Sequence, residues 1–242
     1  MLTIAILSGG LATRLRPITE TIPKSLVDVA GKPFIVRQLE YLRLQGYNRV
    51  VLCVGYLGEQ IEAVVQNGSS FGMEVCYSQD GPGLLGTGGA IINALPLLGE
   101  YFFVFYGDSY LPCDFNAVEL DFYRCGKPAL MTVLRNANKW DKSNVLYEDG
   151  RIVEYNKRCT GAEMSHIDYG LSVLSAAGLA GRATGAAFDL ADVFHELSVL
   201  GQLSGHEVFE RFYEIGSHKG LEETINFFLQ KESYDLYATT FE

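Results

Sequence analysis

The chain opens with an apolar run that two glycines end, LTIAILSGG at residues 2–10. A short, continuous apolar run is typical of a parallel strand that is covered on both faces. The run is far shorter than a membrane-spanning segment, and no basic region precedes it as in a signal peptide. We therefore expect a buried first strand at residues 2–7 whose carboxyl end opens into a loop. Pro17 and Pro23 exclude a long helix from that loop, which we expect to run to Lys32.

Helix and strand patterns alternate through the rest of the first half. Apolar residues recur at helical spacing after Pro33, after Leu57 and after Thr87, which is a candidate helix N-cap. Short apolar runs typical of strands lie between these helical patterns. This alternation predicts a doubly wound, Rossmann-like α/β sheet. The expected helices span residues 33–46, 57–66 and 87–98, and the expected strands span residues 49–54, 74–78 and 101–106.

Strand patterns dominate the second half of the chain. Asp149-Gly150 separates two short strand patterns, which indicates a tight β-hairpin. Asp189 is a candidate N-cap for an amphipathic helix, and a last helix is expected to begin near Ser217. These patterns predict that the sheet is mixed and that the second half forms a small β-rich annex. The expected strands span residues 128–134, 145–147, 152–155, 166–174 and 208–215.

The overall charge is acidic, with 19 Lys and Arg against 29 Asp and Glu and a formal net charge of −10. Nucleic acids and anionic membranes are bound by clustered positive charge, so this composition argues against both partners. Hydrophobic residues make up 48% of the chain, which is enough for a large core. The exception to the acidic balance is local, since Arg14, Arg16 and Lys24 follow the glycines closely. A basic pocket on an acidic protein suits a small anionic ligand.

Cysteine and histidine residues show neither a disulfide framework nor a metal-ligand pattern. The five cysteines are scattered and odd in number, without a C-x-x-C pair, and the four histidines lack ligand spacing. Thiols of this kind are typical of a protein that is kept reduced in the cytoplasm. We therefore expect a cytoplasmic protein without zinc.

The glycine turn after the first strand is the strongest functional signal. Open α/β sheets bind ligands at the carboxyl ends of their strands, where Gly9 and Gly10 are expected. Because these residues lack side chains, their backbone N–H groups can approach phosphate oxygens. Arg14 can bind a phosphate bidentately, and Lys24 adds a mobile charge. The sequence has no Walker A motif and no G-x-G-x-x-G opening a helix, which argues against a P-loop enzyme and a dehydrogenase.

The loop resembles the signature of the sugar-phosphate nucleotidylyltransferases. Residues 7–17, LSGGLATRLRP, and 23–26, PKSL, are similar to the family pattern G-G-x-G-T-R-[LM]-x-P…P-K. Three further segments agree with the family in order and spacing: LGTGGA at 85–90, YGD at 106–108 and EIGS at 214–217. The resemblance covers nearly the whole chain. It is strongest to the short enzymes that act on heptose 1-phosphate (guanylyl transfer) or N-acetylmuramate 1-phosphate (uridylyl transfer).

The resemblance implies transfer of a nucleotidyl group from a nucleoside triphosphate to a sugar 1-phosphate, with Mg²⁺ and release of pyrophosphate. It implies catalytic roles for Arg14 and Lys24 and Mg²⁺ ligation by Asp108 and Glu214. Residues 1–242 would form a single domain, with a nucleotide-binding half at 1–110 and an acceptor-binding half at 111–242. The implied nucleotide-binding residues are Leu7, Ser8, Gly9, Gly10, Thr13, Gln79, Gly86, Thr87, Tyr106 and Gly107. The implied acceptor-binding residues are Asn144, Asn156, Lys157, Asp168 and Gly170.

Several positions depart from the family pattern. Glu214 replaces a metal-binding aspartate, Asn156 replaces a glutamate that often binds a sugar hydroxyl, and Asp168 stands where asparagine is usual. Asparagine donates and accepts hydrogen bonds whereas aspartate only accepts, so a different pattern of acceptor hydroxyls is expected. Ala12 replaces a common glycine, and we expect its φ to be negative, because a Cβ is then tolerated. Uridylyl enzymes of the family often carry Ala-Ala-Gly or Ala-Gly-Gly where this chain has Ser8-Gly9-Gly10, so the resemblance favours a guanine, cytosine or thymine nucleotide over a uracil nucleotide.

Two other functions stay open. Asn156 and Asp168 remove the usual sugar-binding pair, which keeps a cytidylyltransferase for an amino-alcohol or amino-acid phosphate as an alternative. The second is a non-catalytic nucleotide-sensing subunit, although a sensor does not need Arg14, Lys24 and Asp108 together. The expected partners are a nucleoside triphosphate and a small phosphorylated acceptor, with no nucleic acid and no membrane. A homodimer is also left open.

Overall fold

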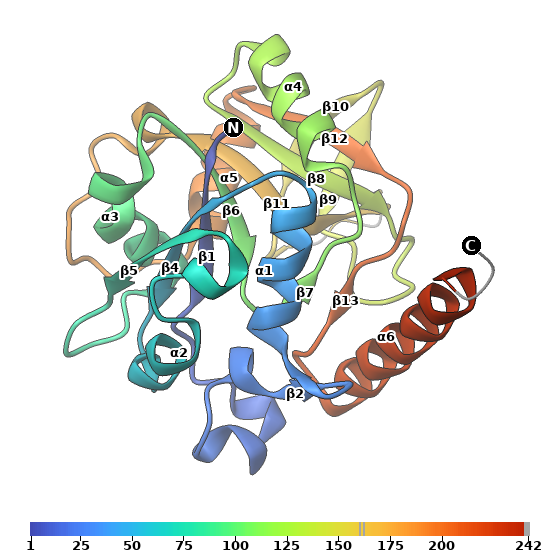
Figure 1. The fold of residues 1–242 in the computed structure, drawn as a ribbon. Coiled ribbons are helices and arrows are strands. Elements are labelled where there is room, and N and C mark those ends of the chain that lie inside the picture. Colours follow the sequence, from blue (N-terminus) through green and yellow to red (C-terminus); the bar gives the residue numbers. More distant parts are fainter. Residues whose placement is uncertain (160, 162, 240–242) are drawn as a thin grey trace.

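The computed structural model describes residues 1–159, 161 and 163–239, and its centre is one nine-stranded mixed sheet (Figure 1). The strand order is β10-β9-β11-β6-β1-β4-β5, and β8 joins the sheet by pairing with β11 and β12. The strands of this sheet are β1 (Thr3–Ser8), β4 (Arg49–Val54), β5 (Glu74–Gln79), β6 (Tyr101–Tyr106), β8 (Ala129–Arg135), β9 (Val145–Glu148), β10 (Arg151–Tyr155), β11 (His166–Ser175) and β12 (Leu203–Val208). Two small ribbons pair β2 (Asp28–Val29) with β3 (Lys32–Pro33), and β7 (Ser109–Tyr110) with β13 (Tyr213–Glu214).

Helices cover both faces of the sheet, and short 3₁₀ turns take up much of the loop after β1. The helices are α1 (Phe34–Leu44), α2 (Gly58–Val65), α3 (Gly86–Leu98), α4 (Phe115–Cys125), α5 (Leu190–Val199) and α6 (His218–Thr239). The 3₁₀ turns of that loop span Thr13–Leu15, Ile18–Glu20 and Lys24–Leu26, as expected of a segment interrupted by prolines. Within the described residues, no helix combines the length and the apolar character that crossing a bilayer demands.

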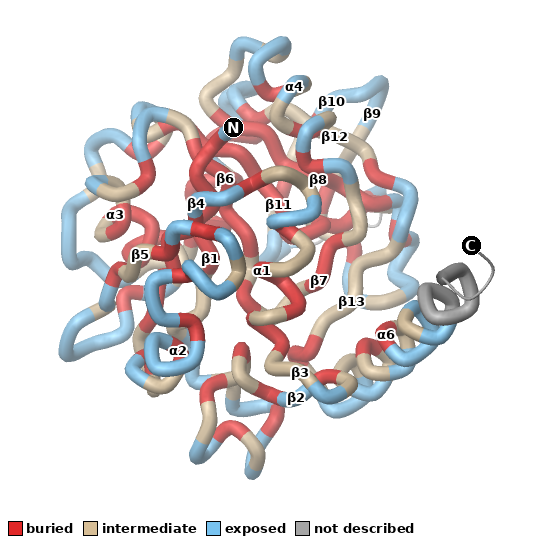
Figure 2. The backbone as a smooth tube through the Cα atoms, in the orientation of Figure 1, coloured by how far each residue is buried: buried red, intermediate tan, exposed pale blue. Residues whose placement is uncertain are grey.

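The two faces of the sheet carry separate hydrophobic cores because side chains alternate along each strand. In β1, Ile4 and Ile6 pack with α1, α2 and α4, whereas Ala5 packs with α3 and α5. In β6, Phe103 belongs to the first core and Phe102 to the second. Figure 2 shows the central strands buried along most of their length. The parallel order β6-β1-β4-β5 with helices on both faces confirms the predicted doubly wound sheet.

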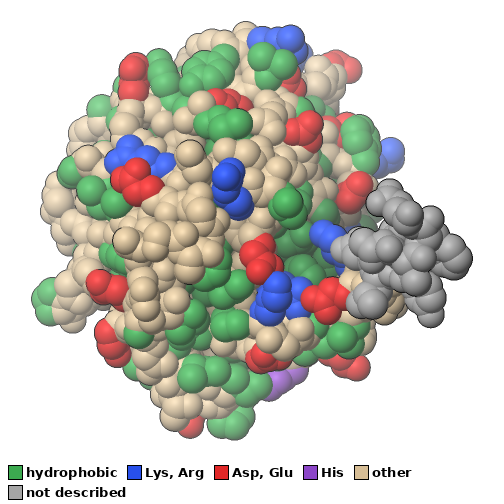
Figure 3. Space-filling view, in the orientation of Figure 1, with side chains coloured by type: hydrophobic (Ala, Val, Ile, Leu, Met, Phe, Trp, Pro, Cys, Tyr) green, Lys and Arg blue, Asp and Glu red, His purple; other side chains and the backbone are tan. Residues whose placement is uncertain are grey.

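The second half continues this sheet with mixed strand directions. Strand β11 runs antiparallel to both β6 and β8, and β12 runs parallel to β8. The predicted hairpin is confirmed, since β9 and β10 pair around Asp149 and Gly150, which have φ of 48° and 75°. Positive φ at both turn residues is what a two-residue type I′ hairpin requires. Charged side chains of both signs are mixed on the face drawn in Figure 3.

Three expectations are corrected. Residues 208–215 do not form one strand, because β12 ends at Val208 and β13 leaves the sheet edge to pair with β7. Thr87 is not the N-cap of α3, which begins at Gly86. The Thr87 hydroxyl instead donates to the Asp189 carboxylate and accepts a hydrogen bond from the Leu190 N–H, the first residue of α5. Helix α4 is additional to the predicted elements. Asp114, its N-cap, accepts hydrogen bonds from the N–H groups of the second and third residues that follow it.

The first turn of α3 is shaped by the segment that precedes α5. The Gly88 N–H donates to the Phe188 carbonyl at 3.0 Å, and the Phe188 N–H donates to the Leu85 carbonyl at 3.1 Å. A Cβ on Gly88 would lie 2.1 Å from the Phe188 ring, and one on Gly89 would lie 2.3 Å from the Ala186 carbonyl oxygen. The glycines of the 85–90 segment therefore permit close packing of two chain segments about 100 residues apart.

We expect Gly88→Ala to destabilise the protein by about 1–3 kcal/mol through overpacking against Phe188. Helix propensity alone predicts the opposite, a gain of about 1 kcal/mol. Gly83→Ala is the matched control, because its Cβ would meet no atom within 4 Å. Urea unfolding of both variants measures the difference, and a Gly88→Ala protein as stable as the wild type would contradict the packing argument.

Candidate active site

Two pockets meet at the carboxyl end of β6. A cavity of about 210 Å³, which we call the glycine pocket, lies over the carboxyl ends of β1 and β6, and a cavity of about 330 Å³, the polar pocket, lies beside it. Both are lined by Tyr106 and Asp108. The glycine pocket is lined by Leu7, Ser8, Gly9, Gly10, Ala12, Lys24, Ser25, Cys53, Asp80, Leu84, Gly86, Thr87, Ala90, Tyr106, Gly107 and Asp108. The polar pocket is lined by Tyr106, Asp108, Ser109, Lys139, Trp140, Asp141, Asn144, Tyr155, Lys157, Ile167, Asp168, Tyr169, Gly170, Arg211, Phe212, Glu214, Ser217, Lys219, Gly220 and Glu223.

The floor of the glycine pocket depends on a close approach of two backbone segments. The Gly107 N–H donates to the Leu7 carbonyl at 3.0 Å, which extends the β1–β6 pairing to the end of both strands. A Cβ on Gly107 would lie 2.3 Å from Ser8 Oγ, so only glycine fits there. Gly10 has open space around its Cα, since a Cβ at this position would meet no atom within 4 Å. The loop thus presents bare backbone to the pocket.

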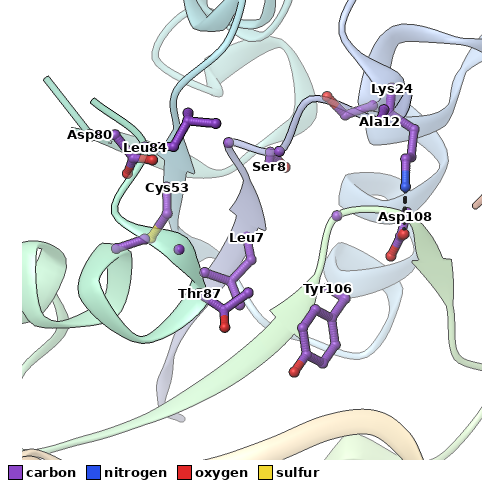
Figure 4. A pocket seen from close by; sticks show the side chains of 16 residues that line it. Leu7, Ser8, Ala12, Lys24, Cys53, Asp80, Leu84, Thr87, Tyr106 and Asp108 are labelled. Carbon is purple, nitrogen blue, oxygen red and sulfur yellow. Dashed lines mark hydrogen bonds and ion pairs between the residues drawn. The ribbon is translucent and has the colours of Figure 1, made fainter. Parts of the chain in front are cut away.

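The two ends of the glycine pocket differ in charge. Figure 4 shows Lys24 and Asp108 at one end and Asp80 and Leu84 at the other. Lys24 Nζ donates to Asp108 Oδ2 at 2.8 Å, and both side chains are largely buried. The hydroxyls of Ser8 and Ser25, which also line this pocket, are buried and have no hydrogen-bond partner within the described residues. A cation and free donors therefore gather around the glycine loop.

A small strand pair brings Glu214 to Asp108. Glu214 in β13 lies opposite Ser109 in β7, and the Ile215 N–H donates to the Asp108 carbonyl at 2.9 Å. Helix α6 supports this ribbon, since Thr224 Oγ1 donates to the Glu214 carbonyl at 3.0 Å. Burial raises the pKa of the Glu214 carboxyl, and the nearby Asp108 charge raises it further. The two carboxylates are therefore close enough to repel each other.

Cations offset this repulsion in part. Arg14 and Lys24 act to lower the Glu214 pKa, against the larger effects of burial and Asp108. A Cβ on Gly216 would lie 2.6 Å from Glu214 Oε2 and 3.0 Å from an Arg14 guanidinium nitrogen, so the three groups adjoin. In the described ranges, no three His, Cys, Asp or Glu side chains are grouped to hold a metal ion. Two carboxylates nevertheless suit Mg²⁺, which takes few protein ligands and completes its shell with phosphate and water oxygens.

The polar pocket is organised around Asp168 in β11. The Asp168 N–H donates to Asn144 Oδ1 at 2.9 Å, and Asp168 Oδ1 accepts from the Gly170 N–H at 2.9 Å. Gly170 has φ +103°, which explains the glycine, and the strand register shifts between Asp168 and Ser172. Burial raises the Asp168 pKa to about 6, although the Gly170 hydrogen bond and the Lys157 charge oppose this. Asp168 thus presents an acceptor with little solvation to the pocket.

Most of the residues expected from the sequence lie around these two pockets. Those at the glycine pocket are Leu7, Ser8, Gly9, Gly10, Lys24, Gly86, Thr87, Tyr106, Gly107 and Asp108. Those at the polar pocket are Asn144, Lys157, Asp168, Gly170, Glu214 and, again, Tyr106 and Asp108. Four expected residues line neither pocket: Thr13, Arg14, Gln79 and Asn156. Arg14 still adjoins the site through Glu214.

Local geometry explains the other three positions. Thr13 begins a 3₁₀ turn beyond the glycine loop. Gln79 is exposed at the end of β5, and its side-chain oxygen lies towards Gly58 in α2. Asn156 Oδ1 accepts hydrogen bonds from the N–H groups of Arg158 and Cys159, so this side chain closes its own turn.

Ala12 adopts a conformation opposite to the one expected. Its φ is 50° and its ψ is 41°, in the left-handed region, so the expectation of a negative φ is wrong. The carbonyl of Ala12 accepts hydrogen bonds from Thr19 Oγ1 and the Leu15 N–H, and these bonds hold the strained turn. Ala12 lines the glycine pocket.

Sequence reasoning missed several pocket residues, of which Asp80, Trp140 and Arg211 are the most chemically distinctive. Arg211 lies over the Trp140 ring at 5.2 Å and over the Tyr213 ring at 4.7 Å. No short motif contains these residues, because they reach the pockets from loops whose positions depend on the whole fold. Asp80 had one available signal, namely its place directly after a predicted parallel strand.

Comparison with known proteins agrees with this geometry. The family described as "Nucleotidyl transferase" matches residues 4–139, more than half of the chain. The chain belongs to this family. The resemblance expected from the glycine loop is thereby confirmed. The matched residues of the nucleotidyl transferase family include the whole glycine pocket.

Relatives within the family act on different nucleotides. The N-acetylmuramate alpha-1-phosphate uridylyltransferase of Neisseria meningitidis is 44% identical over 113 residues, which cover 46% of this chain and 49% of that protein. The D-glycero-alpha-D-manno-heptose 1-phosphate guanylyltransferase of Campylobacter jejuni is 32% identical over 144 residues, which cover 60% of this chain and 62% of that protein. Each alignment therefore spans less than two thirds of the relative's length.

A solved structure extends the similarity to nearly the whole transferase chain. HddC from Yersinia pseudotuberculosis superposes with a TM-score of 0.75 at 25% identity, over 94% of this chain and 100% of that chain. The fold similarity thus extends into residues 140–242, which lie beyond the residues that the family match covers.

The raised pKa of Asp168 predicts a pH-dependent contribution to stability. The Asp168 pKa is about 6 in the folded protein, compared with the ordinary aspartate value of 3.8 that is expected in the unfolded chain. Between these values the folded protein keeps a proton that the unfolded chain has released, so stability falls as pH rises through this window. Asp168→Asn cannot titrate. Its stability relative to the wild type should therefore increase from pH of about 4 to about 6, by at most about 1.4 kcal/mol per unit, and then level off.

Urea unfolding at several pH values measures this difference. Asp149→Asn, in the exposed turn between β9 and β10, is the matched control and should show no such trend. A constant difference between Asp168→Asn and the wild type across the window would show that Asp168 titrates normally.

Proposed function

We propose that this protein transfers a nucleotidyl group from a nucleoside triphosphate to a sugar 1-phosphate and releases pyrophosphate. The observation that carries the proposal is that the glycine pocket and the polar pocket share Tyr106 and Asp108. A triphosphate in the glycine pocket and a phosphorylated acceptor in the polar pocket would bring their phosphates together beside Asp108. Residues 1–110 would thus supply most of the nucleotide site and residues 111–242 most of the acceptor site. The cytoplasm, which supplies nucleoside triphosphates, is the expected location.

The chemistry is an in-line displacement at the α-phosphorus. An oxygen of the acceptor phosphate forms a bond to the α-phosphorus while the bond from that phosphorus to the bridging oxygen of pyrophosphate breaks. The products are a nucleoside diphosphate sugar and pyrophosphate. Because the attacking oxygen is already anionic, no general base is required. The main barrier is the repulsion between two anions, so the residues of the site must neutralise charge and align the reactants.

Lys24 and Arg14 are the residues that would neutralise this charge. Lys24 lies in the glycine pocket with Nζ 2.8 Å from Asp108, at the boundary between the two pockets. We assign to Lys24 the binding of the phosphate groups at the place where the two substrates meet. Arg14 adjoins Glu214 and Gly216 and would stabilise the charge that develops on the departing pyrophosphate. The backbone of Gly9 and Gly10 and the free hydroxyls of Ser8 and Ser25 would donate hydrogen bonds to phosphate oxygens.

Asp108 and Glu214 are the residues that would hold Mg²⁺. Burial and, after it, the Asp108 charge raise the Glu214 pKa, and a divalent cation bound between the two carboxylates would oppose both effects. When bound, the ion would neutralise charge on the phosphates and favour departure of pyrophosphate. The β7–β13 ribbon and α6 would keep the two carboxylates at a fixed separation.

The polar pocket suits an acceptor rich in hydrogen-bond donors. Asp168 accepts but does not donate, and it lies beside Asn144 and Lys157. Sugar hydroxyls are suitable donors. An ammonium group would also satisfy the buried Asp168 carboxylate, and this keeps the cytidylyltransferase for an amino-alcohol or amino-acid phosphate as the second candidate. The sensing subunit is less well supported, because a sensor gains nothing from a cation placed between two substrate pockets.

Pyrophosphate release from a panel of substrates tests the proposal. Each nucleoside triphosphate is combined with hexose 1-phosphates, heptose 1-phosphate, N-acetylmuramate 1-phosphate, phosphocholine and phosphoserine. We expect release only when a triphosphate and a sugar 1-phosphate are both present. Release with phosphocholine or phosphoserine alone among the acceptors would favour the second candidate, and tight triphosphate binding without turnover of any acceptor would favour the sensor.

Asp108→Asn should lower kcat for pyrophosphate release by about 100-fold or more, because it removes a carboxylate that would hold Mg²⁺ where the phosphates meet. Glu214→Gln should cause a smaller loss, since Asp108 would remain to bind Mg²⁺. Chelation with EDTA should abolish wild-type release, and Mg²⁺ should restore it. Glu59→Gln, an exposed change of the same kind in α2, is the control. Full activity of a folded Asp108→Asn protein would remove Asp108 from the reaction.

A further inference from the structure

Asp80 lies at the end of the glycine pocket that is remote from the phosphate-binding residues. Figure 4 shows Asp80 and Leu84 opposite the Lys24–Asp108 pair, with Cys53 and Thr87 lining the pocket below. If the proposed function holds and the phosphates lie near Lys24, the nucleobase must extend towards Asp80. The inference below rests on the proposed function for this orientation.

The Asp80 carboxylate has one oxygen engaged and one free. Oδ2 accepts a hydrogen bond from the Leu85 N–H at 3.3 Å, and Cβ atoms on Gly9 and Gly55 would lie 3.2 Å and 3.0 Å from it. Oδ1 makes no hydrogen bond within the described part of the chain. The two flanking glycines leave just enough room for the carboxylate. Partial burial raises the Asp80 pKa, and the Leu85 N–H offsets this only in part.

The bases differ in what they can offer to such a carboxylate. Guanine alone presents two adjacent donors, N1–H and the 2-amino group, and a carboxylate can accept from both. Uracil and thymine present one N–H between two carbonyl oxygens, which a carboxylate would repel. Adenine and cytosine place an amino group beside a ring nitrogen that is itself an acceptor. An acceptor that is shielded from water and left without a donor is destabilised, so a carboxylate at this end of the pocket would discriminate among the bases.

We propose that Asp80 selects guanine, so that the nucleotide substrate of this protein is GTP. The carboxylate accepts hydrogen bonds from guanine N1–H and the 2-amino group, and Leu84 and Ala90 pack beside the base. Gln79, the neighbour expected from the sequence to contact the nucleotide, is exposed and lies towards α2, so it does not compete for this role. A relative that is 44% identical over 113 residues is a uridylyltransferase. Selection by the Asp80 carboxylate would nevertheless give this protein a preference for guanine.

Inosine triphosphate is the sharpest probe, because it differs from GTP only by the missing 2-amino group. We expect wild-type kcat/KM with GTP to exceed that with ITP by about 10- to 100-fold, and that with UTP or dTTP by more. Asp80→Asn keeps an acceptor for the Leu85 N–H but can accept only one of the two guanine donors. It should reduce the GTP:ITP ratio to about threefold or less and raise the use of UTP and dTTP relative to GTP.

Two further measurements separate recognition from folding and from catalysis. Thermal unfolding of Asp80→Asn without ligand should match the wild type, and Glu59→Gln should keep the wild-type GTP:ITP ratio. Calorimetric binding of GDP and IDP gives the same comparison without turnover, and the GDP preference should fall in Asp80→Asn.

The outcomes distinguish this inference from the proposed function. Three results would overturn the role of Asp80: equal use of GTP and ITP by the wild type, a wild-type preference for UTP, or an unchanged GTP:ITP ratio in Asp80→Asn. Pyrophosphate release in these experiments would still support the transferase reaction. If no triphosphate reacts with any sugar 1-phosphate, the proposed function fails, and the GDP and IDP affinities still decide whether Asp80 selects guanine.

Discussion

The close approach of Gly107 to the end of β1 is the constraint on which the site depends. Any side chain at Gly107 would collide with Ser8 and with the Leu7 carbonyl, so the two strand ends can meet only through glycine. Their contact places the bare glycine loop directly beside Asp108. A bare backbone, to which we assign the triphosphate, and a carboxylate thereby adjoin at the carboxyl ends of the strands, where open α/β folds present their ligand sites.

A second contact adds charge to this edge from the far end of the chain. The β7–β13 ribbon holds Glu214 beside Asp108, and α6 packs over the ribbon with Phe228 in a third small core that also contains Ile215 and Tyr110. The carboxylates repel each other, and Lys24 and Arg14 offset that repulsion. Two carboxylates and two cations are thus gathered at one place, which is the kind of charge cluster typical of functional sites.

The two pockets divide recognition between different kinds of group. The glycine pocket has apolar walls and one carboxylate, Asp80, at its far end, which suits a flat base. The polar pocket has Asp168, Asn144 and Lys157 on strands and loops of the second half, which suits a compact polar acceptor. In the function that we propose, changes in β8–β13 would alter the acceptor site and leave the nucleotide site in place.

The sequence by itself determined the doubly wound half, the hairpin at Asp149-Gly150 and the position of the glycine loop at the end of the first strand, because strand length, turn residues and helical spacing are local properties. It also identified Asp108 and Glu214 as partners through resemblance. Only the tertiary structure decided which neighbours enter the pockets. Asp80 lines one and Gln79 does not, because the direction of a side chain at a strand end depends on the contacts of the following loop. Asn156 and Ala12 are set by hydrogen bonds to near neighbours in the chain: Asn156 closes its own turn with Arg158 and Cys159, and Thr19 and Leu15 hold the left-handed Ala12. The sequence pattern does not show these bonds, because the folded path of each loop decides which donors reach which acceptors.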